Sequence, residues 1–256
     1  MKVQNITPNE KIAQYVDRIL VIESNVFHNP FILPLYANGV PTLLFKSVKG
    51  KLGNSNSNYL TLFGQTILPE QLTISEDFTL IAYFFKSHVL GPLFGISANE
   101  LTDKPIDLSL LSPQKIVTLQ ERLLHCESIE NMILLLDNYV YSLVKSAKEI
   151  LSTIKYASEK IAKYYSKESL LNIQRELNIS ERTFQRMFEK NIGISPNIYR
   201  RICQFNAAFV DLNFRNYNNL SDIAYNHGYA DQSHYIRAFR EFTNINPREY
   251  LNYGKD

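Results

Sequence analysis

The chain has 256 residues, with 27 Lys and Arg against 25 Asp and Glu, and hydrophobic residues make up 45% of it. That length fits one large domain or two ordinary ones, and the apolar content excludes an intrinsically disordered chain. The charge is unevenly divided: residues 151–256 hold 15 Lys and Arg against 11 Asp and Glu, whereas residues 1–150 hold 12 against 14. A basic C-terminal half indicates a polyanionic partner for that half alone.

The cysteines, histidines and apolar stretches of the chain argue against several classes of protein. Cys126 and Cys203 are too far apart for a disulfide framework or a zinc-ligand spacing. The charged N-terminus predicts no signal peptide, and no stretch reaches the roughly 18 apolar residues of a membrane span. The five histidines are scattered, so no metal is expected: His28, His88, His125, His227 and His234. With no signal peptide or membrane span, we expect a cytoplasmic protein. With no phosphate-binding loop or nucleophile elbow, we expect no catalytic residue and no cofactor.

In chain order, residues 31–86 contain short apolar runs separated by turn sequences. The runs are FILPLY, VPTLLFKSV, YLTLFGQTIL and LTISEDFTLIAYFF, and the polar stretch KGKLGNSNSN (49–58) predicts a hairpin loop. This pattern is typical of a small antiparallel β domain. We expect a helix over 9–18 before it and a short helix over 88–95 after it.

The pattern becomes helical from Ser112 onward. SPQKIVTLQERLLHC (112–126) repeats apolar residues at helical spacing, with Ser112 as N-cap and Pro113 in the first turn. ESIENMILLLDNYVYSLVKSA (127–147) predicts a second helix that is apolar over more than half of its circumference. A helix that buries only one face needs a narrower apolar stripe than this. It is therefore either a core helix or a dimerisation helix, and we favour a role in self-association.

An internal repeat follows. LLNIQRELNISERTFQRMFEKNIGISPNIY (170–199) aligns with LSDIAYNHGYADQSHYIRAFREFTNINPREY (220–250), with one extra residue in the second copy. Matching pairs are Ile173 and Ile223, Phe188 and Phe239, Pro196 and Pro247, and Tyr199 and Tyr250. A self-similarity of about 50 residues indicates one supersecondary unit used twice.

Each unit predicts a short helix, a tight turn and a second helix. In the first unit, a helix over Ser169–Leu177 leads to a turn, and Ser180 caps a second helix over 181–190. In the second unit, a helix over Ser221–Asn226 leads to a turn in which Gly228 supplies the positive φ. Asp231 then caps a second helix over 232–242. A long helix over 195–213 joins the units. This is the helix-turn-helix arrangement, whose second helix can enter the DNA major groove.

Residues of about 150–254 resemble the DNA-binding domain of the AraC/XylS family of bacterial transcription regulators. The second unit matches at Ile223, Ala224, Gly228, Tyr229, Asp231, Ser233, Tyr235, Arg237, Phe239, Pro247 and Tyr250. The first unit matches at Leu177, Ser180, Arg182, Phe184, Arg186, Phe188, Gly193, Ser195, Pro196 and Tyr199. The connecting helix of the family matches YRRICQFNAAFVDL (199–212).

Three positions depart from the family pattern. Asn244 stands where the family usually has glycine, and Asn tolerates the left-handed conformation that such a turn requires. Gln174 replaces a small residue of the first helix. Gln204 replaces a common arginine of the connecting helix, which implies the loss of a phosphate contact.

The candidate DNA contacts follow from helical spacing. Phe184 and Phe188 belong to the core, which leaves Arg182, Gln185 and Arg186 together on the outer face of the first recognition helix. Arginine can bind guanine and glutamine can bind adenine with paired hydrogen bonds. For the second recognition helix, the candidates are Gln232, Ser233, His234 and Arg237. The phosphate candidates are Lys190, Arg200, Arg201 and Arg240, each of which could equally be a plain surface charge.

The resemblance implies an α+β protein. By domain order alone, residues 1–110 form a small antiparallel, cupin-like β domain and 111–149 a helical linker or dimerisation segment; 150–256 form an all-α DNA-binding domain with helix-turn-helix motifs at 169–190 and 220–242. Aromatic residues of the β domain could line an effector pocket, although most should fill the core: Phe31, Tyr36, Phe45, Tyr59, Phe63, Phe78, Tyr83, Phe84 and Phe85.

Three hypotheses about function result. The first is a sequence-specific regulator that binds double-stranded DNA and activates transcription when a small effector binds the N-terminal domain. It would act as a homodimer, contact RNA polymerase and have no membrane partner. The second is a ligand-independent regulator whose N-terminal half only dimerises or contacts other proteins. The third is an enzyme fused to the same domain, like the related DNA-alkylation repair proteins. Those need a cluster of cysteines, and two distant cysteines argue against it.

Overall fold

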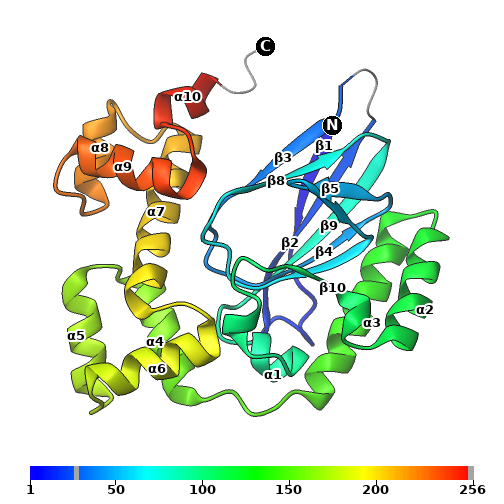
Figure 1. Ribbon diagram of the computed structural model, residues 1–256, viewed down its shortest axis with the longest axis horizontal. Helices are drawn as coiled ribbons and strands as arrows, with labels where there is room; N and C mark the ends of the chain where they lie inside the picture. Colours follow the sequence, from blue (N-terminus) through cyan, green and yellow to red (C-terminus); the bar gives the residue numbers. More distant parts are fainter. Residues whose placement is uncertain (26–28, 253–256) are drawn as a thin grey trace.

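Two antiparallel sheets form the N-terminal half of the computed structural model, which describes residues 1–25 and 29–252 (Figure 1). The larger sheet has the strand order β1 (Lys2–Ile6), β2 (Val16–Ser24), β9 (Phe78–Phe85), β4 (Thr42–Lys46), β7 (Leu60–Phe63), β10 (Ile106–Asp107). The smaller sheet has the order β3 (Phe31–Leu35), β8 (Glu70–Ile74), β5 (Gly50–Leu52), β6 (Ser55–Ser57). The antiparallel β domain predicted for this part of the chain is confirmed.

The helix expected over 9–18 is wrong. Asn9 and Ile12 instead accept turn hydrogen bonds, from Ala13 at 3.0 Å and from Val16 at 2.9 Å, and β2 begins at Val16. β2 then pairs with β1 on one side and with β9 on the other. A short run with several Val and Ile residues is compatible with either structure locally, and sheet pairing decides between them.

The hairpin loop expected over 49–58 is itself a hairpin. Gly50 pairs with Ser57 and Leu52 with Ser55, so β5 and β6 lie inside the predicted loop. Backbone pairing at the edge of a sheet needs no apolar pattern, which is why a polar sequence hides these strands. The short helix expected over 88–95 is confirmed as α1 (Leu90–Phe94).

Both faces of the central strands β4 and β9 are buried, which explains the continuous apolar sequence of β9. Side chains alternate along a strand, so Leu80 and Ala82 face the smaller sheet, in one core cluster with Leu72 of β8. Ile81 and Phe85 face the opposite way, in a second cluster with residues of α2 (Pro113–Leu124) and α3 (Ile129–Ser146). The strands are thus enclosed between a smaller sheet and a pair of helices.

The helix α3 contributes to this second core rather than being free on all sides. Met132, Leu136 and Val140 are buried one helical turn apart, whereas Leu134 on another face is 58% exposed. Asp137, the one carboxylate in the apolar part of α3, accepts a hydrogen bond of 2.7 Å from the Tyr83 hydroxyl of β9. Burial raises the pKa values of both groups. The core role of α3 is confirmed, and its role in self-association remains a prediction.

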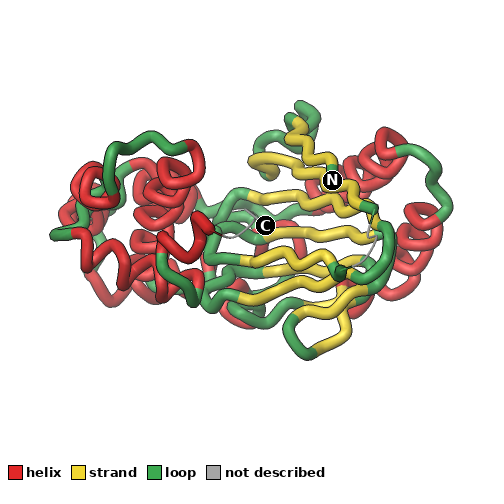
Figure 2. The backbone as a smooth tube through the Cα atoms, turned by 90° about the horizontal axis from the view of Figure 1, so that it is seen from above, coloured by secondary structure: helices red, strands yellow, loops and turns green. Residues whose placement is uncertain are grey.

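Seven helices lie within residues 152–252, the described part of the C-terminal region. Their bounds are α4 (Ser152–Lys163), α5 (Lys167–Glu176), α6 (Glu181–Ile192), α7 (Pro196–Phe214), α8 (Leu220–Asn226), α9 (Gln232–Thr243) and α10 (Pro247–Asn252). Figure 1 shows α7 running from the α5–α6 pair to the α8–α9 pair. Seen from above, this helical region and the α2–α3 pair lie on opposite sides of the strands (Figure 2). The two helix-turn-helix units and the long connecting helix are as predicted.

The two halves of the chain touch over an interface that combines apolar and polar contacts, with Ala37 buried in the core of the C-terminal half. The 3₁₀-helix η1 (Ala98–Glu100) of the N-terminal half packs against α6 at this interface. A second 3₁₀-helix, η2 (Leu108–Leu110), packs against α2. Hydrogen bonds across the interface include Tyr199 to Ser87 at 3.0 Å, His88 to Ser158 at 3.1 Å, Thr102 to the Gly193 carbonyl at 2.9 Å, and Asn206 to the Asn38 carbonyl at 3.0 Å. Directional contacts of this kind fix one relative orientation of the two halves.

Throughout residues 1–25 and 29–252, no helix has the combined length and apolar character that crossing a membrane requires.

Candidate nucleic-acid interface

The helix α6 is built as an amphipathic element with a defined start and end. The Ser180 hydroxyl caps it by accepting a hydrogen bond from the Thr183 amide at 3.2 Å. Phe184 and Phe188 are buried, with ring centroids 5.7 Å apart, and Gly193 ends the helix in the left-handed conformation at φ +98°. The core positions predicted from spacing are confirmed, so the opposite face is directed outward.

Arg182, Gln185 and Arg186 occupy that outward face and are all exposed. Gln185 donates to Glu189 at 3.0 Å, one turn further along the helix. Neither Arg182 nor Arg186 forms an ion pair with another described residue. Pairing of these arginines with Glu181 or Glu189, which would make the face an ordinary solvated one, is therefore not seen. The two guanidinium groups are available to an external partner.

The second recognition helix, α9, repeats this construction. Asp231 caps it by accepting from the His234 amide at 2.7 Å, and Tyr235 and Phe239 are fully buried. Asn244 ends it with φ +64°, so the left-handed turn expected at this departure from the family pattern is confirmed. Asn reaches this region at lower cost than other non-glycine residues.

The candidate contacts of α9 lie in unequal environments. Ser233, His234 and Arg237 are exposed. Gln232 is half-buried, and its side-chain oxygen accepts a hydrogen bond of 2.9 Å from Ser221 of α8. The His234 ring accepts from the Ala230 amide at 3.3 Å. Of the four candidates, Arg237 thus combines exposure with a permanent charge, and Gln232 would have to break an internal contact to reach a base.

The phosphate candidates separate into three groups. Lys190 and Arg240 are exposed charges at the C-terminal ends of α6 and α9. Arg201 is 33% exposed in its side chain, pairs with Glu241 and lies 5.5 Å from the Phe242 ring. Arg200 is only 5% exposed, and its guanidinium is used inside the domain. This placement does not support a phosphate contact by Arg200, so we correct that expectation.

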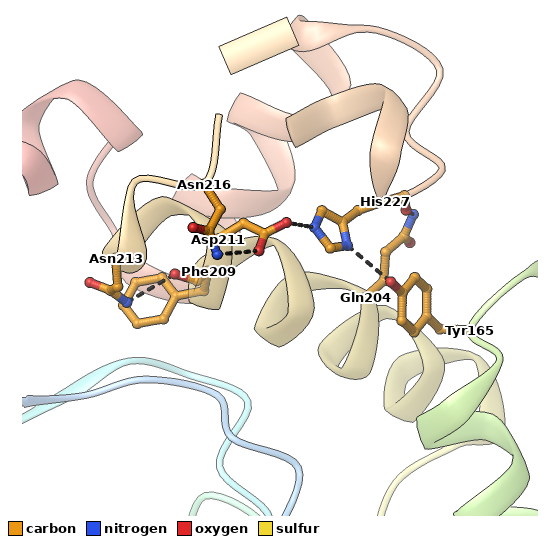
Figure 3. Close-up of polar contacts among 7 residues, drawn as sticks. All are labelled: Tyr165, Gln204, Phe209, Asp211, Asn213, Asn216 and His227. Atoms are coloured by element: carbon orange, nitrogen blue, oxygen red, sulfur yellow. Dashed lines mark hydrogen bonds and ion pairs between the residues drawn. The ribbon is translucent and has the colours of Figure 1, made fainter. Parts of the chain in front are cut away.

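Arg200 is part of a polar network that the sequence did not reveal. It donates to the Tyr165 carbonyl at 3.0 Å and to Gln204 at 3.1 Å, and Gln204 donates to the His227 carbonyl at 2.8 Å. Gln204, one helical turn beyond Arg200, is thus a buried internal residue here, and the position has no free side chain for phosphate. The His227 ring also contacts Tyr165 and Asp211 (Figure 3).

Tyr165, Arg200, Gln204 and His227 line part of a groove of about 960 Å³ between the two units. Helix periodicity could place Arg200, Gln204 and Asp211 on one face of α7. Tyr165 and His227, by contrast, are 62 positions apart and meet only in the folded domain. In the sequence, His227 was one of five scattered histidines, and no local pattern indicates its partners.

A helix-turn-helix domain family model matches residues 173–253, and a domain of unknown function matches residues 4–107. Two solved structures of ToxT from Vibrio cholerae have the same fold. One is 16% identical, covers 98% of each chain and has a TM-score of 0.53. The other, from Vibrio cholerae O395, is 16% identical, covers 91% of this chain and 96% of that one, and has a TM-score of 0.51. No curated protein matches this chain in sequence.

The C-terminal part of the chain contains a helix-turn-helix domain, over residues 173–253. The α+β fold, with a β-rich N-terminal half before the AraC-type domain, agrees with the resemblance inferred from sequence. The helix-turn-helix match lies in the C-terminal half, whereas the likeness to the solved structures extends over the whole chain and shows a shared fold. In the residues that the structure covers, no group of three or more His, Cys, Asp or Glu side chains could hold a metal ion; His28 lies outside them.

Proposed function

We propose that this protein is a sequence-specific transcription regulator that binds double-stranded DNA through both units of its AraC-type domain. The observation that carries the proposal is the outward face of α6, where Arg182 and Arg186 are exposed without a carboxylate partner. Their guanidinium groups can each donate two parallel hydrogen bonds to guanine. Arg237 gives α9 an equivalent group.

The proposed contacts have two tasks. Arg182, Gln185 and Arg186 of α6, with Ser233, His234 and Arg237 of α9, would contact base edges. Lys190, Arg201 and Arg240 would contact phosphates and set the position of the domain on the duplex. The two recognition helices are joined by α7, whose 19 residues span about 28 Å, whereas one turn of B-DNA advances about 34 Å. Binding of both helices in successive grooves would therefore favour DNA that bends toward the protein.

The test is a binding titration with a duplex selected from a random-sequence library by the wild-type protein. Arg186→Ala should lose about 1–3 kcal/mol of discrimination against a changed base at one position of the site. The matched control is Arg175→Ala on the exposed face of α5, which removes the same charge from the first helix of the same unit. Equal loss of discrimination in both variants, or wild-type binding without sequence preference, would overturn the proposal.

We also propose that the N-terminal half senses a small, mainly apolar molecule. A cavity of about 220 Å³ lies between the two sheets, lined by Leu44, Ala82 and Phe84 of the larger sheet and by Leu33 and Leu35 of β3. Drug-sized ligands occupy about 300–1,000 Å³, so the effector would be smaller than those or would widen the cavity. Of the nine aromatic residues considered as pocket lining, only Tyr36, Phe63 and Phe84 line this cavity.

The cavity wall continues into the domain interface, which supports a link between effector and DNA. Tyr36 lines the cavity and lies edge-on to Phe209 of α7, with ring centroids 5.8 Å apart. Asn38 lines it too, and its carbonyl accepts from Asn206 of α7. A ligand that moves this wall would move the helix that connects the two recognition helices.

Thermal-shift measurements with a metabolite library would test the sensor proposal. A binding metabolite should raise the melting temperature of the wild type and not that of Ala82→Phe, which fills the cavity. If no metabolite binds, or if Ala82→Phe responds equally, the alternative stands: a ligand-independent regulator whose N-terminal half dimerises or contacts other proteins.

The remaining parts of the proposal follow the family resemblance. The protein would activate transcription in the cytoplasm through RNA polymerase and act as a homodimer, with the exposed part of α3 around Leu134 as one candidate contact. Transcription from a promoter carrying the selected site, in the presence of purified polymerase, distinguishes activation from repression. Sedimentation of wild type and Leu134→Glu tests the dimer, which the charge should weaken.

A further inference from the structure

Three side chains from three separate segments meet between the helix-turn-helix units (Figure 3). Tyr165 lies between α4 and α5, directly before the first unit, Asp211 lies near the end of α7, and His227 follows α8 in the turn of the second unit. The His227 ring lies 2.7 Å from Asp211 through Nε2 and 2.9 Å from the Tyr165 hydroxyl through Nδ1. Both ring nitrogens are thus used.

Chemistry decides which group donates. An ionised carboxylate only accepts, so Nε2 carries a proton and donates to Asp211. In the neutral ring, Nδ1 then accepts from the Tyr165 hydroxyl. In the charged ring, Nδ1 also carries a proton, and the hydroxyl can rotate to accept it. The two contacts therefore persist in both protonation states of His227.

A second set of bonds holds the backbone of the same residues. Arg200 donates to the carbonyl of Tyr165, and Gln204 donates to the carbonyl of His227, at 3.0 Å and 2.8 Å. Arg200 and Gln204 also bond to each other at 3.1 Å. Tyr165 and His227 are consequently each held by main chain and side chain, with α7 between them. Only 11% of the His227 side chain is exposed, so water competes weakly for these bonds.

The helix α7 cannot by itself set the orientation of the second unit. It ends at Phe214. The next residue, Arg215, takes the left-handed conformation at φ +55°, and a short link of residues 215–219 leads to α8. Such a link permits rotation about the end of α7. Apolar contacts in the shared core oppose that rotation but have little directionality. Hydrogen bonds depend strongly on angle and select one orientation.

We propose that Tyr165, His227 and Asp211 form a positioning triad that fixes the second recognition helix relative to the first. The triad thereby determines which spacing between two half-sites the protein accepts. Its members are positioning residues that act through α6 and α9 and need not touch DNA. The inference rests on the proposed binding of DNA by both units.

The test uses the full-length protein and the duplex that the wild type selects from a random-sequence library. Affinity is measured for the whole site, for each half alone, and for sites with one base pair inserted or removed between the halves. Tyr165→Phe removes one hydroxyl and keeps the ring. The matched control is Tyr164→Phe, which removes the hydroxyl of the adjacent tyrosine, 53% exposed and outside the triad. Asp211→Asn keeps an acceptor for His227 and serves as the conservative variant.

For Tyr165→Phe we expect about tenfold weaker binding of the whole site and less than about twofold change on either half, because a fixed spacing raises the effective concentration of the second unit. The penalty for an inserted base pair should shrink. Tyr164→Phe and Asp211→Asn should keep the wild-type spacing preference. A uniform loss on halves and whole site, with the spacing penalty unchanged, would mean a merely structural role and overturn the proposal.

An unchanged Tyr165→Phe variant would overturn it as well. Thermal unfolding of each variant accompanies the titrations, and should Tyr165→Phe unfold below the assay temperature, His227→Gln replaces it with the same expectations. If the proposed function itself is wrong, the wild-type protein will enrich no sequence from the library. That result is obtained before any variant is compared, so it is distinct from a failure of the positioning triad.

Discussion

Arg200 and Arg201 are adjacent in the sequence, yet the structure places them in different environments. Arg200 is 5% exposed and bonded within the domain, whereas Arg201 is at the surface with Glu241. A step of one residue turns a helix by about 100°, so neighbouring arginines point to different faces. Which face is buried depends on what packs there. The loop carrying Tyr165, far away in sequence, covers the face of Arg200.

Asn244 offers a test of local backbone conformation. Its φ of +64° suits asparagine and glycine and disfavours branched residues. Asn244→Gly should keep or slightly raise the free energy of unfolding, and Asn244→Val should lower it by about 1–2 kcal/mol. Urea denaturation measures both. Substituting Ala207, which lies inside α7, by glycine is the opposite control, because glycine in a helix interior is about 1 kcal/mol less favourable than alanine.

His88 makes stability depend on pH. It is 2% exposed at the domain interface, and burial, with Lys155 and Lys86 nearby, lowers its pKa to about 4 from the usual 6.5. Above pH 6.5 both states hold a neutral ring. As the pH falls toward 4, the unfolded chain binds a proton that the folded protein excludes, so the contribution of His88 to stability is lost, by up to about 3 kcal/mol.

The free energy of unfolding, measured between pH 7.5 and pH 4, should therefore fall more steeply in the wild type than in His88→Asn. His125→Asn, which changes an exposed histidine of the same half, should follow the wild-type curve. Parallel curves for the wild type and His88→Asn would show that the ring is not buried as a neutral group.

At the scale of the element, α6 has a defined start and stop that do not depend on DNA. The Ser180 cap is the start, and its removal in Ser180→Ala should cost about 1 kcal/mol of unfolding free energy. Ser180→Asp retains a capping oxygen and should restore that stability. The added negative charge should nonetheless weaken DNA binding if α6 approaches phosphates. Calorimetry and DNA titration together separate the two effects.

The control for the cap is Ser142→Ala, an exposed serine inside α3 that bonds only to a carbonyl of its own helix. Alanine favours a helix interior, so no loss of stability is expected there. A Ser180→Asp variant that is stable and still binds DNA with wild-type affinity would place the start of α6 away from the phosphates.

Strands and helices differ in how much local pattern reveals. The helices α6 and α9 follow from periodicity with named caps, because all their backbone bonds are local. The start of β2 was included in the helix expected over 9–18, and β5 and β6 were predicted as a loop, because a strand is completed by a partner elsewhere in the chain. Residues 16–24 could not reveal that β9 lies beside them.

At the scale of the whole molecule, Gly193 joins the first recognition helix to the N-terminal half. A Cβ added there would lie 2.7 Å from the Ala98 carbonyl of η1 and 2.8 Å from the Thr102 hydroxyl. Gly95 has a similar positive φ of +71°, with nothing within 4 Å of an added Cβ. The two glycines therefore share a backbone penalty and differ in the contact between domains.

Gly95→Ala should lower the free energy of unfolding by about 1–2 kcal/mol, the cost of the left-handed conformation alone. Gly193→Ala should cost more and should also separate the halves, since η1 can no longer approach α6. Denaturation measures the first effect, and protease cleavage between residues 146 and 152 the second. Equal losses, with equal resistance to cleavage, would mean that the two halves do not dock in solution as they do here.

Local pattern was sufficient for the most specific conclusion about this protein. The repeat, the caps at Ser180 and Asp231 and the apolar spacing of Phe184, Phe188, Tyr235 and Phe239 identify two helix-turn-helix units, because all these signals lie within a few residues of one another. Once the apolar positions are assigned to the core, the opposite face of each recognition helix must point outward.

Contacts between distant segments required the tertiary structure. The burial of Arg200, the meeting of Tyr165 with His227, the closure of the sheets around a small cavity and the docking of η1 on Gly193 each join positions tens of residues apart. No sequence periodicity spans such distances, because the side chains at these positions fit a contact with a distant segment and follow no repeating pattern. The chemistry that can bind DNA was thus visible in the chain, and the geometry that would space and regulate it arises only on folding.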